Sequence, residues 1–296
     1  MVSLKEDLQR RLTTFDEFKS LTLRVLDYLG AVVSEKSVHG EYTLMSSTIA
    51  GTTKQIRPYC TSLFLDDQKM FLQSFAEFMK ILNWLRSNKS YNLNFQPKTI
   101  DAVLYTIQQS IGMGMDLSVE PNSSRKHVGN RFEELIKTLF DEIGVAAKKV
   151  VLNIPYKTEE GKKHYKCEID LVISPHEEVI SNSSNLHIDE TVITLKTTTK
   201  DRMPKIFIDK ILMERFVGHQ VKVVGISLND IQRKQMDKVS STFVSNLFMV
   251  YTEFLTELEG YYYLDMPKRA LESPFSNHIQ NFSTFLITDL WELLHP

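Results

Sequence analysis

The stretch from Lys166 to Arg215 constrains the fold of this chain more than any other part of it. It contains two short runs rich in valine and isoleucine, CEIDLVIS and TVITLK, separated by a polar segment with an NSSN tract. Apolar runs of this length between polar loops are typical of buried strands. The segment PKIFIDKILMER follows, with Pro204 suited to a helix start and Gly218 suited to a helix stop. The pattern therefore predicts two adjacent strands followed by a helix.

The flanking sequence extends this prediction to a complete sheet. RFEELIKTLFDEIG has apolar residues at three- and four-residue steps and predicts an amphipathic helix that ends at Gly144. AAKKVVLNIPY and VKVVGISL predict further strands, and YYYLDMP is expected to be an edge strand because Pro267 cannot donate to a ladder. A last helix is expected over about residues 284–294. The order of elements predicts an α/β fold with a mixed central β-sheet flanked by helices.

The first third of the chain has a different character. Residues 1–115 are expected to form a helical N-terminal region, and residues 116–296 the core with its C-terminal helix. Stripes of aromatic side chains such as Phe71, Phe75 and Phe78 predict helix packing. Residues 34–42 and residues 112–130 are rich in polar or loop-forming residues, so both are expected to be loops.

Composition bounds the class of protein. The chain has 296 residues, 42% of them hydrophobic, which is enough for one large domain or one domain with a helical extension. A net charge of −2 does not by itself predict nucleic-acid binding, although it permits a local basic cleft. No run approaches the about 18 apolar residues of a membrane span, so a soluble, cytoplasmic protein is expected. Cys60 and Cys167 are expected to be reduced, and His164 and His176 are isolated in the sequence, so no zinc site is expected.

Three charged residues are expected to converge at the two central strands. Asp170 lies in the first strand, Lys196 ends the second, and Asp209 lies on the helix that follows. Carboxylates are hard oxygen ligands that suit Mg²⁺, and a nearby lysine can stabilise developing negative charge. These residue types are the ones that hydrolysis of a phosphodiester requires.

With these residues the chain resembles the PD-(D/E)XK nuclease superfamily. The signature of that superfamily is an acidic residue on an early helix, an Asp on a strand, and an acid-X-Lys sequence on the next strand. Glu133 in GNRFEELI, Asp170 in CEIDLVIS, and Lys196 in TLK look like these positions. The resemblance covers about residues 126–264.

One position departs from the signature, and the departure points to a subgroup. Thr194 stands where the acid of acid-X-Lys is expected. In type II restriction endonucleases that cut CCGG or CCNGG sites, this acid is displaced to the following helix, where Asp209 lies in this chain. That subgroup also carries a basic-acidic-Arg triplet shortly after the lysine, which Lys200-Asp201-Arg202 resembles. Basic side chains can donate to guanine and an aspartate can accept from cytosine, so a triplet of this kind could read two G·C pairs.

The resemblance implies a Mg²⁺-dependent type II restriction endonuclease. Such an enzyme would cleave double-stranded DNA at a short palindromic site containing CC/GG and leave 5′-phosphates. Asp170 and Asp209 would ligate the ion, Glu133 would bind a second ion or its waters, and Lys196 would orient the attacking water. A homodimer and a cognate DNA methyltransferase in the same cell are also implied. The choice between Glu133 and Glu134, the recognition sequence, the cut position, and a dimer or tetramer remain open.

Two alternative functions remain open as well. One is a nuclease of DNA repair or recombination that reads DNA structure, with the Lys200–Arg202 triplet contacting the backbone. The other is a DNA-binding module without catalysis, which is suggested by Thr194 at the position where the superfamily has an acid. For the restriction endonuclease, the resemblance also implies that an unpaired central base could be flipped onto an aromatic or apolar side chain, and that an amide could probe the minor groove. The residues considered for these two roles are Tyr59, Phe64, Trp84, Gln108 and Gln109.

Overall fold

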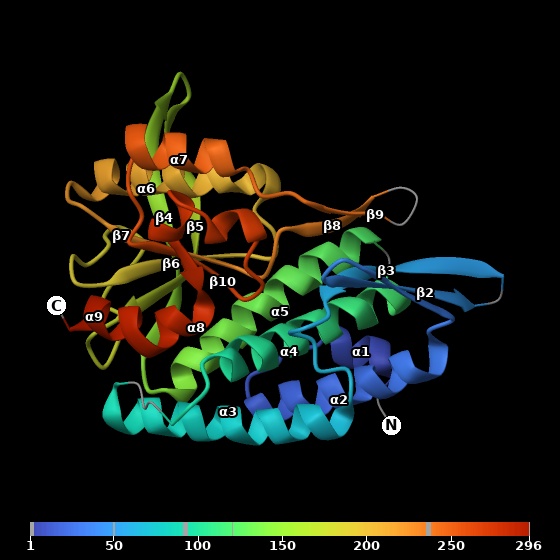
Figure 1. Cartoon of the computed structure of the whole chain (residues 1–296). Helices are drawn as coiled ribbons and strands as arrows, with labels where there is room; N and C mark the ends of the chain where they lie inside the picture. The colour runs from blue at the N-terminus through green and yellow to red at the C-terminus, as the bar shows by residue number, and fades with distance from the viewer. Residues whose placement is uncertain (1–2, 50, 91–93, 120, 235–237, 296) are drawn as a thin grey trace.

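A six-stranded mixed β-sheet lies at the centre of the molecule (Figure 1). The computed structural model describes residues 3–49, 51–90, 94–119, 121–234 and 238–295. The strand order is β11-β10-β7-β6-β5-β4; β4, β5 and β6 pair antiparallel, and β6, β7, β10 and β11 pair parallel. The predicted fold class is confirmed. The strands are β4 (Ala146–Thr158), β5 (Gly161–Ser174), β6 (Thr191–Lys196), β7 (Lys222–Ser227), β10 (Gly260–Tyr263) and β11 (Ile279–Asn281).

Successive residues of the central strands enter two different hydrophobic cores, as the pleat of a strand requires. On β6, Val192 belongs to one core, whereas Ile193 and Leu195 belong to the other. On β7, Val223 and Val224 divide between the same two cores. Both faces of the sheet are therefore covered, which explains why these strands read as continuous apolar runs in the sequence.

Two helices cover one face of the sheet, α6 (Met203–Val217) and α7 (Ser245–Phe254) (Figure 1). The prediction of α6 is confirmed: Pro204 lies in its first turn, and Gly218 ends it in the left-handed conformation with φ of 80°. Phe207 of α6 packs edge-on against Phe248 of α7 at 5.8 Å between ring centroids. This pair fixes the helix that carries Asp209 over the strands that carry Asp170 and Lys196.

The opposite face is covered by helices from the first half of the chain (Figure 1). α4 is buried along nearly all of its length because it contacts α5 as well as α1, α2 and α3. No helix in the described part of the chain combines the length and apolar character needed to cross a bilayer. The helices that cover this face of the sheet are α1 (Leu4–Gln9), α2 (Phe15–Val32), α3 (Gln68–Asn88), α4 (Lys98–Ser118) and α5 (Pro121–Glu142).

A three-stranded antiparallel sheet interrupts the helical N-terminal region. It consists of β1 (Glu35–His39), β2 (Tyr42–Ile49) and β3 (Thr52–Cys60). The expectation of a loop over residues 34–42 is wrong, because β1 pairs along its whole length with β2. Every residue of β1 is exposed, so its sequence lacks the alternating apolar pattern by which a strand is recognised.

The expected loop over residues 112–130 is also wrong, because α4 continues to Ser118 and α5 begins at Pro121. The glycines that suggested a loop serve helix packing instead. A Cβ on Gly112 would lie 2.2 Å from a guanidinium nitrogen of Arg57, and one on Gly114 would lie 3.0 Å from Leu8. Glycine is needed there to let neighbouring groups approach the backbone of α4.

The C-terminal part of the chain adds two strands and a final helix. The edge-strand expectation for residues 261–267 is wrong: β10 is paired on both sides, with β7 and with the short β11, and Pro267 lies beyond its end. The expected last helix is confirmed over α8 (Phe282–Thr284), the π-helical turn Phe285–Asp289 and α9 (Leu290–Leu294). Its apolar residues share one core with α2 and α3, so residues from both sides of position 115 pack together.

Candidate active site

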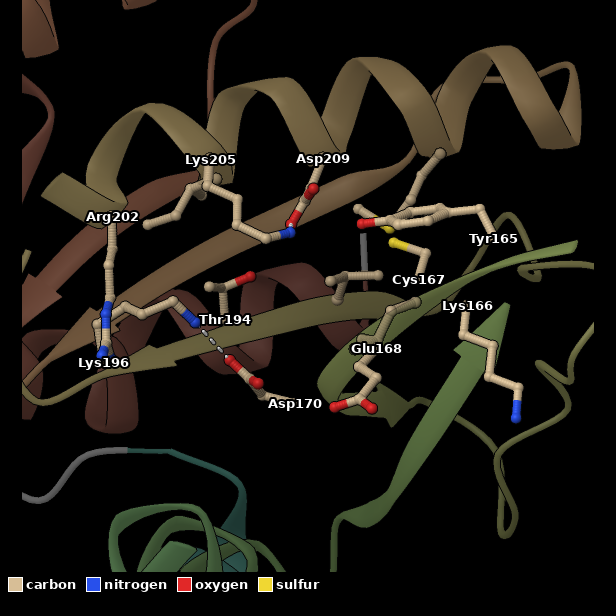
Figure 2. A pocket seen from close by; sticks show the side chains of 14 residues that line it. Tyr165, Lys166, Cys167, Glu168, Asp170, Thr194, Lys196, Arg202, Lys205 and Asp209 are labelled. Atoms are coloured by element: carbon tan, nitrogen blue, oxygen red, sulfur yellow. Dashed lines mark hydrogen bonds and ion pairs between the residues drawn. The ribbon is translucent and has the colours of Figure 1, made fainter. Parts of the chain in front are cut away.

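A pocket of about 420 Å³ lies between β5, β6 and the first half of α6 (Figure 2). Asp170 of β5, Thr194 and Lys196 of β6, and Asp209 of α6 all line it. β5 and β6 are paired side by side, and α6 follows β6 after a short turn. The fold thus brings together the three charged residues that the sequence places on two strands and a helix.

Asp170 and Lys196 form an ion pair across the two strands. Oδ2 of Asp170 accepts from the Lys196 ammonium at 2.9 Å and from the backbone N–H of Leu195 at 2.8 Å. The same ammonium donates to the Leu195 carbonyl at 2.9 Å. The side chains are 18% and 17% exposed, so solvent screens the pair only in part. A lysine ammonium has three N–H donors, and the described residues accept from two of them, so the third is available to a bound molecule.

Asp209 enters the pocket from the opposite side, pointing from α6 toward the strands (Figure 2). Lys205, one turn earlier on α6, donates to its Oδ2 at 2.5 Å. Burial works against the charged form of Lys205, but the hydrogen bond to Asp209 raises the pKa of its ammonium. Thr194 projects into the same pocket from β6, so a hydroxyl on the strand faces a carboxylate from the helix.

The two acidic residues at the start of the predicted helix, Glu133 and Glu134, have different surroundings on α5. Glu133 accepts from Lys149 at 3.1 Å and shares a neighbouring recess with Asp170. Burial and the charge of Asp170 raise the pKa of the Glu133 carboxyl. Glu134 lines the same recess but accepts from the buried Arg131 at 2.8 Å, and its carboxylate is thereby paired away from Lys149. Glu133 is therefore the acid whose electrostatics are linked to the pocket.

Glu168 also lines the pocket, and the sequence analysis missed it. It lies two residues before Asp170 on β5 and therefore on the same face of that strand (Figure 2). The two-residue period of a strand is a signal that could have found it. The pocket thus offers three carboxylates together with the ammonium of Lys196.

The triplet Lys200-Asp201-Arg202 forms a 3₁₀ turn between β6 and α6. The side chain of Asp201 lies outside the described residues. Lys200 and Arg202 line a recess of about 380 Å³ together with Arg57 and Arg125. Arg202 also lines the pocket of Asp170, so the basic recess and the acidic pocket adjoin at this side chain. Arg57 and Arg125 come from distant segments, and no sequence signal links them to the triplet.

A buried aspartate, Asp230, holds the backbone that leads into this turn. It accepts from the N–H of Thr199 at 2.7 Å and the hydroxyl of Thr198 at 3.1 Å. The hydroxyls of Thr199 and Tyr263 also donate to it, the latter at 2.6 Å. Asp230 is a single acid after β7 and follows no motif, so the sequence analysis did not identify it. Five donors on one carboxylate, counting the hydroxyl of Thr242, fix the position of the triplet.

The structure contradicts most of the candidates for base flipping and minor-groove contact. Gln108 and Gln109 are 0% and 1% exposed on α4, and their amides donate to backbone carbonyls inside the protein. Tyr59 and Phe64 are buried and pack against each other at 4.5 Å. Trp84 is partly exposed, but it lies on α3, which belongs to the N-terminal helical layer rather than to the pocket.

The same architecture occurs in a solved structure. The type IIP restriction endonuclease Kpn2I superposes with a TM-score of 0.71 at 20% sequence identity, over 98% of this chain and 97% of that one. The restriction endonuclease PspGI, solved with substrate DNA, gives a TM-score of only 0.40 at 10% identity, over 76% and 92% of the two chains. No protein-family model and no curated protein matches the sequence. The superposition on Kpn2I shows that this chain has the fold of a type II restriction endonuclease, with a mixed central sheet flanked by helices.

Proposed function

We propose that this protein is a Mg²⁺-dependent type II restriction endonuclease that cleaves double-stranded DNA at a short palindromic site containing CC/GG. The observation that carries the proposal is the convergence of Asp170, Lys196 and Asp209 in one pocket, directly beside the basic recess of Lys200 and Arg202. The fold shared with Kpn2I supports the proposal, because the chain places these residues in a restriction endonuclease-like core.

The pocket fits a Mg²⁺ ion by the chemistry of its donors. Asp170 and Asp209 each use Oδ2 in an ion pair, and Oδ1 of each makes no hydrogen bond within the described residues. These free oxygens, with Glu168 beside them, are the hard ligands that Mg²⁺ prefers. When bound, the ion would neutralise charge on the scissile phosphate. Glu133 would bind a second ion or its waters.

The protein's own groups have separate roles in the proposed cleavage. Asp170 and the Leu195 carbonyl fix the ammonium of Lys196 with two of its three donors. The third donor would orient the attacking water and stabilise negative charge on the phosphate as the bond to the 3′ oxygen breaks. The product would carry a 5′-phosphate.

Recognition would take place in the adjoining recess. The guanidinium of Arg202 can donate to guanine O6 and N7, and Asp201 can accept from cytosine N4. Arg57 and Arg125 supply positive charge on the other wall, although Arg57 is partly neutralised by Asp116 at 2.8 Å. A palindromic site calls for a two-fold homodimer in which each subunit cuts one strand. A cognate DNA methyltransferase in the same cell would protect the host sites.

The test is incubation of the purified protein with a long DNA of known sequence, with Mg²⁺ or with a chelator, followed by sequencing of the product ends. Discrete ends that share a short CC/GG palindrome, seen only with Mg²⁺, are the expected result. Ends that follow DNA structure instead of sequence would replace the proposal with a repair-type nuclease. Intact DNA that is retarded in a gel would identify a binding module.

Variants connect the activity to the pocket. Asp170→Ala and Lys196→Ala should each lower cleavage by about 10²-fold or more while DNA binding persists, because each removes a group that acts on the reacting phosphate. Lys80→Ala is a matched control, since Lys80 forms an exposed ion pair with Glu77 on α3 and lines neither the pocket nor the recess of Glu133. Normal cleavage by Asp170→Ala would reject the assignment of the pocket.

Arg202→Ala separates sequence reading from backbone contact. If Arg202 reads guanine, the variant should lose affinity for the cleavage site by about 1–3 kcal/mol and keep its affinity for unrelated DNA. Gel-shift titrations with the two DNAs, at one fixed salt concentration, measure the difference. An equal loss for both DNAs would assign Arg202 to the phosphate backbone.

A further inference from the structure

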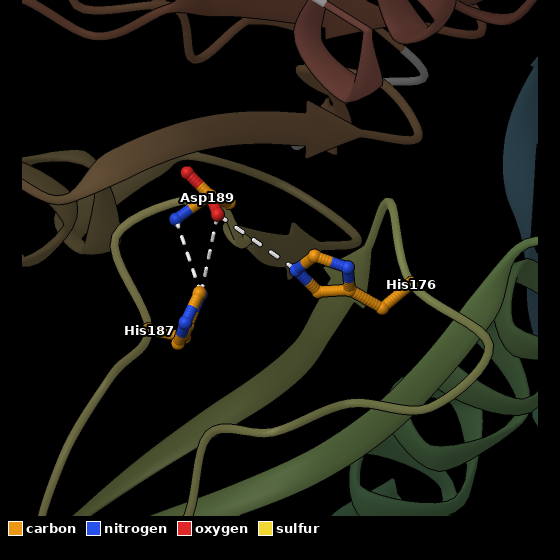
Figure 3. Close-up of side chains that lie close together, drawn as sticks. All are labelled: His176, His187 and Asp189. Carbon is orange, nitrogen blue, oxygen red and sulfur yellow. Dashed lines mark hydrogen bonds and ion pairs between the residues drawn. The ribbon is translucent and has the colours of Figure 1, made fainter.

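The loop between β5 and β6 brings together three side chains that can ligate a metal ion (Figure 3). His176 lies just after the end of β5, and His187 and Asp189 lie just before β6 begins. His176 is isolated in the sequence and the histidine spacing suggests no zinc site, but the loop folds back and places it beside His187. Spacing along the chain is a poor guide to this proximity, because the two histidines stand eleven positions apart and are brought together by the loop between the paired strands.

The carboxylate–imidazole distances in this cluster suit a coordination sphere better than a direct hydrogen bond, and the long contact from the Asp189 backbone N–H to His187 Nδ1, at 3.4 Å, is one that a metal ion would replace. Asp189 Oδ2 lies 3.8 Å from His176 Nε2 and 3.7 Å from His187 Nδ1. Both distances exceed those of a charge-assisted hydrogen bond. Two ligand atoms bound to one tetrahedral zinc at 2.0–2.2 Å are separated by about 3.4 Å. The three candidate atoms all lie within 4.8 Å of one another, and two of the three residues, His176 and Asp189, are exposed.

The rest of the loop holds these ligands in place. The buried carboxylate of Glu190 accepts from the backbone N–H of Ile180 at 2.6 Å and of Ser181 at 2.9 Å. The hydroxyl of Ser181 in turn accepts from the N–H of His187 at 2.9 Å. The backbone of His187 is therefore anchored through two successive contacts. This anchoring lowers the entropy that would be lost when a metal ion binds.

We propose that His176, His187 and Asp189 bind one divalent transition-metal ion, with Zn²⁺ as the best match. Two imidazoles and a carboxylate with an open fourth position match zinc, whereas Mg²⁺ and Ca²⁺ prefer sites made of oxygen ligands. The ion ties the exit of β5 to the entrance of β6. The site is separate from the pocket of Asp170, because Thr191 at the start of β6 and Lys196 at its end are roughly 16 Å apart along the strand.

The experiment is a titration of tag-free, chelator-treated protein with Zn²⁺ in a calorimeter, with Co²⁺ as a spectroscopic substitute. The wild-type chain should bind one more equivalent of Zn²⁺ than His187→Ala or His176→Ala. Bound Co²⁺ should give the visible absorption of a tetrahedral site, and that signal should be lost in the same variants. Circular dichroism of each variant establishes that the fold is intact.

Two controls make the result specific. His164→Ala removes an exposed histidine elsewhere on β5 and should leave Zn²⁺ binding unchanged. Asp170→Ala should also retain the equivalent of Zn²⁺ that His187→Ala loses, because it alters only the other pocket. The same Zn²⁺ stoichiometry in the wild type and in His187→Ala would overturn the proposal. So would loss of the ion in Asp170→Ala with retention in His187→Ala. Neither outcome depends on whether the protein cuts DNA.

Discussion

Thr194 and Asp209 share one pocket although they come from a strand and a helix. A carboxylate at either position would face the pocket that Asp170 and Lys196 also line. Asp209 is held by Lys205, which keeps its carboxylate oriented even though it is anchored on α6. The location of the acid in space, rather than its position in the sequence, is therefore what the proposed chemistry requires.

This reasoning predicts that the acid can be moved. Asp209→Ala should lower DNA cleavage by about 10²-fold or more, as expected when a group that stabilises charge in a transition state is removed. Adding Thr194→Glu in that background should restore part of the loss. Initial cleavage rates on plasmid DNA at saturating Mg²⁺ measure both steps. Full activity of the Asp209→Ala single variant would show that this carboxylate takes no part.

Residues of the site differ in how far the sequence could predict them. Asp170, Lys196 and Asp209 were predictable because strand and helix periodicity places them on neighbouring elements that follow one another in the chain. Arg57 and Arg125 were not, since they reach the recess from β3 and α5 through long-range packing. Their assignment to DNA contact, like the roles of the other site residues, stays a prediction.

At the scale of elements, the turn Lys200–Arg202 is positioned by a residue that lies far from it in the sequence. Asp230 follows β7, yet its carboxylate binds the backbone of Thr199 immediately before the turn. The hydroxyl of Tyr263 on β10 donates to the same carboxylate. The orientation of the turn is thus tied to the sheet through one buried acceptor, which makes Asp230 a positioning residue.

We expect Asp230→Asn to weaken specific DNA binding severalfold, because one oxygen that accepts hydrogen bonds becomes a donor and the turn loses its anchor. Tyr263→Phe is the matched control, since it removes a donor from the same carboxylate but leaves the contact to Thr199. Dissociation constants and unfolding free energies of both variants separate positioning from stability. If binding falls in proportion to stability in both, Asp230 is only structural.

Helix α4 offers a second test at this scale. Gly112→Ala should destabilise the protein by about 1–3 kcal/mol, because its new Cβ would displace the guanidinium of Arg57 that Asp116 holds. Gly129→Ala on α5, where no atom lies within 4 Å of the new Cβ, should stabilise the protein by about 0.5–1 kcal/mol. Urea unfolding curves measure both changes. Equal effects at the two positions would contradict the packing assigned to α4.

These elements also show which parts of the fold the sequence could reveal. β5, β6 and α6 were predicted because buried strands and a capped helix leave strong apolar patterns. β1 was missed because all of its residues are exposed. The end of α4 was missed because Gly112 and Gly114 count as loop residues in a local reading, whereas packing against Arg57 and Leu8 requires them within a helix.

At the scale of the whole molecule, two buried carboxyls join the N-terminal layer to the C-terminal part. Asp101 of α4 accepts from the backbone N–H of Ser283 at 2.8 Å and from its hydroxyl at 2.6 Å. Asp265, just past β10, accepts from the hydroxyl of Tyr105 on α4 at 3.3 Å. Burial raises the pKa of both carboxyls to about 7. In the folded protein each carboxyl therefore binds its proton more tightly than in the unfolded chain.

The sign of the resulting pH dependence follows from linkage. The contribution of the protonated carboxyl to the free energy of unfolding is fully present below the unfolded pKa of 3.8. It is lost as pH rises through the folded pKa of about 7. For Asp101 the loss is on the order of 4 kcal/mol.

Asp101→Asn cannot ionise, so its advantage over the wild type should grow between pH 5 and pH 8.5. Urea unfolding at the two pH values tests this, with the exposed Asp141→Asn as control. Parallel curves for wild type and Asp101→Asn would contradict it.

The hydrophobic core shared by α2, α3 and α9 also bears on how the protein unfolds. Trp84 lies on α3 and Trp291 on α9, and Phe18 and Phe285 belong to the same continuous core. We expect a single cooperative transition in which the fluorescence of both tryptophans changes together, as Trp84→Phe and Trp291→Phe would show separately. On this expectation, neither half of the chain would fold on its own. For a protein proposed to cut DNA, this means that a damaged or incomplete copy would lose its active site along with its fold, instead of persisting as a nuclease without its specificity.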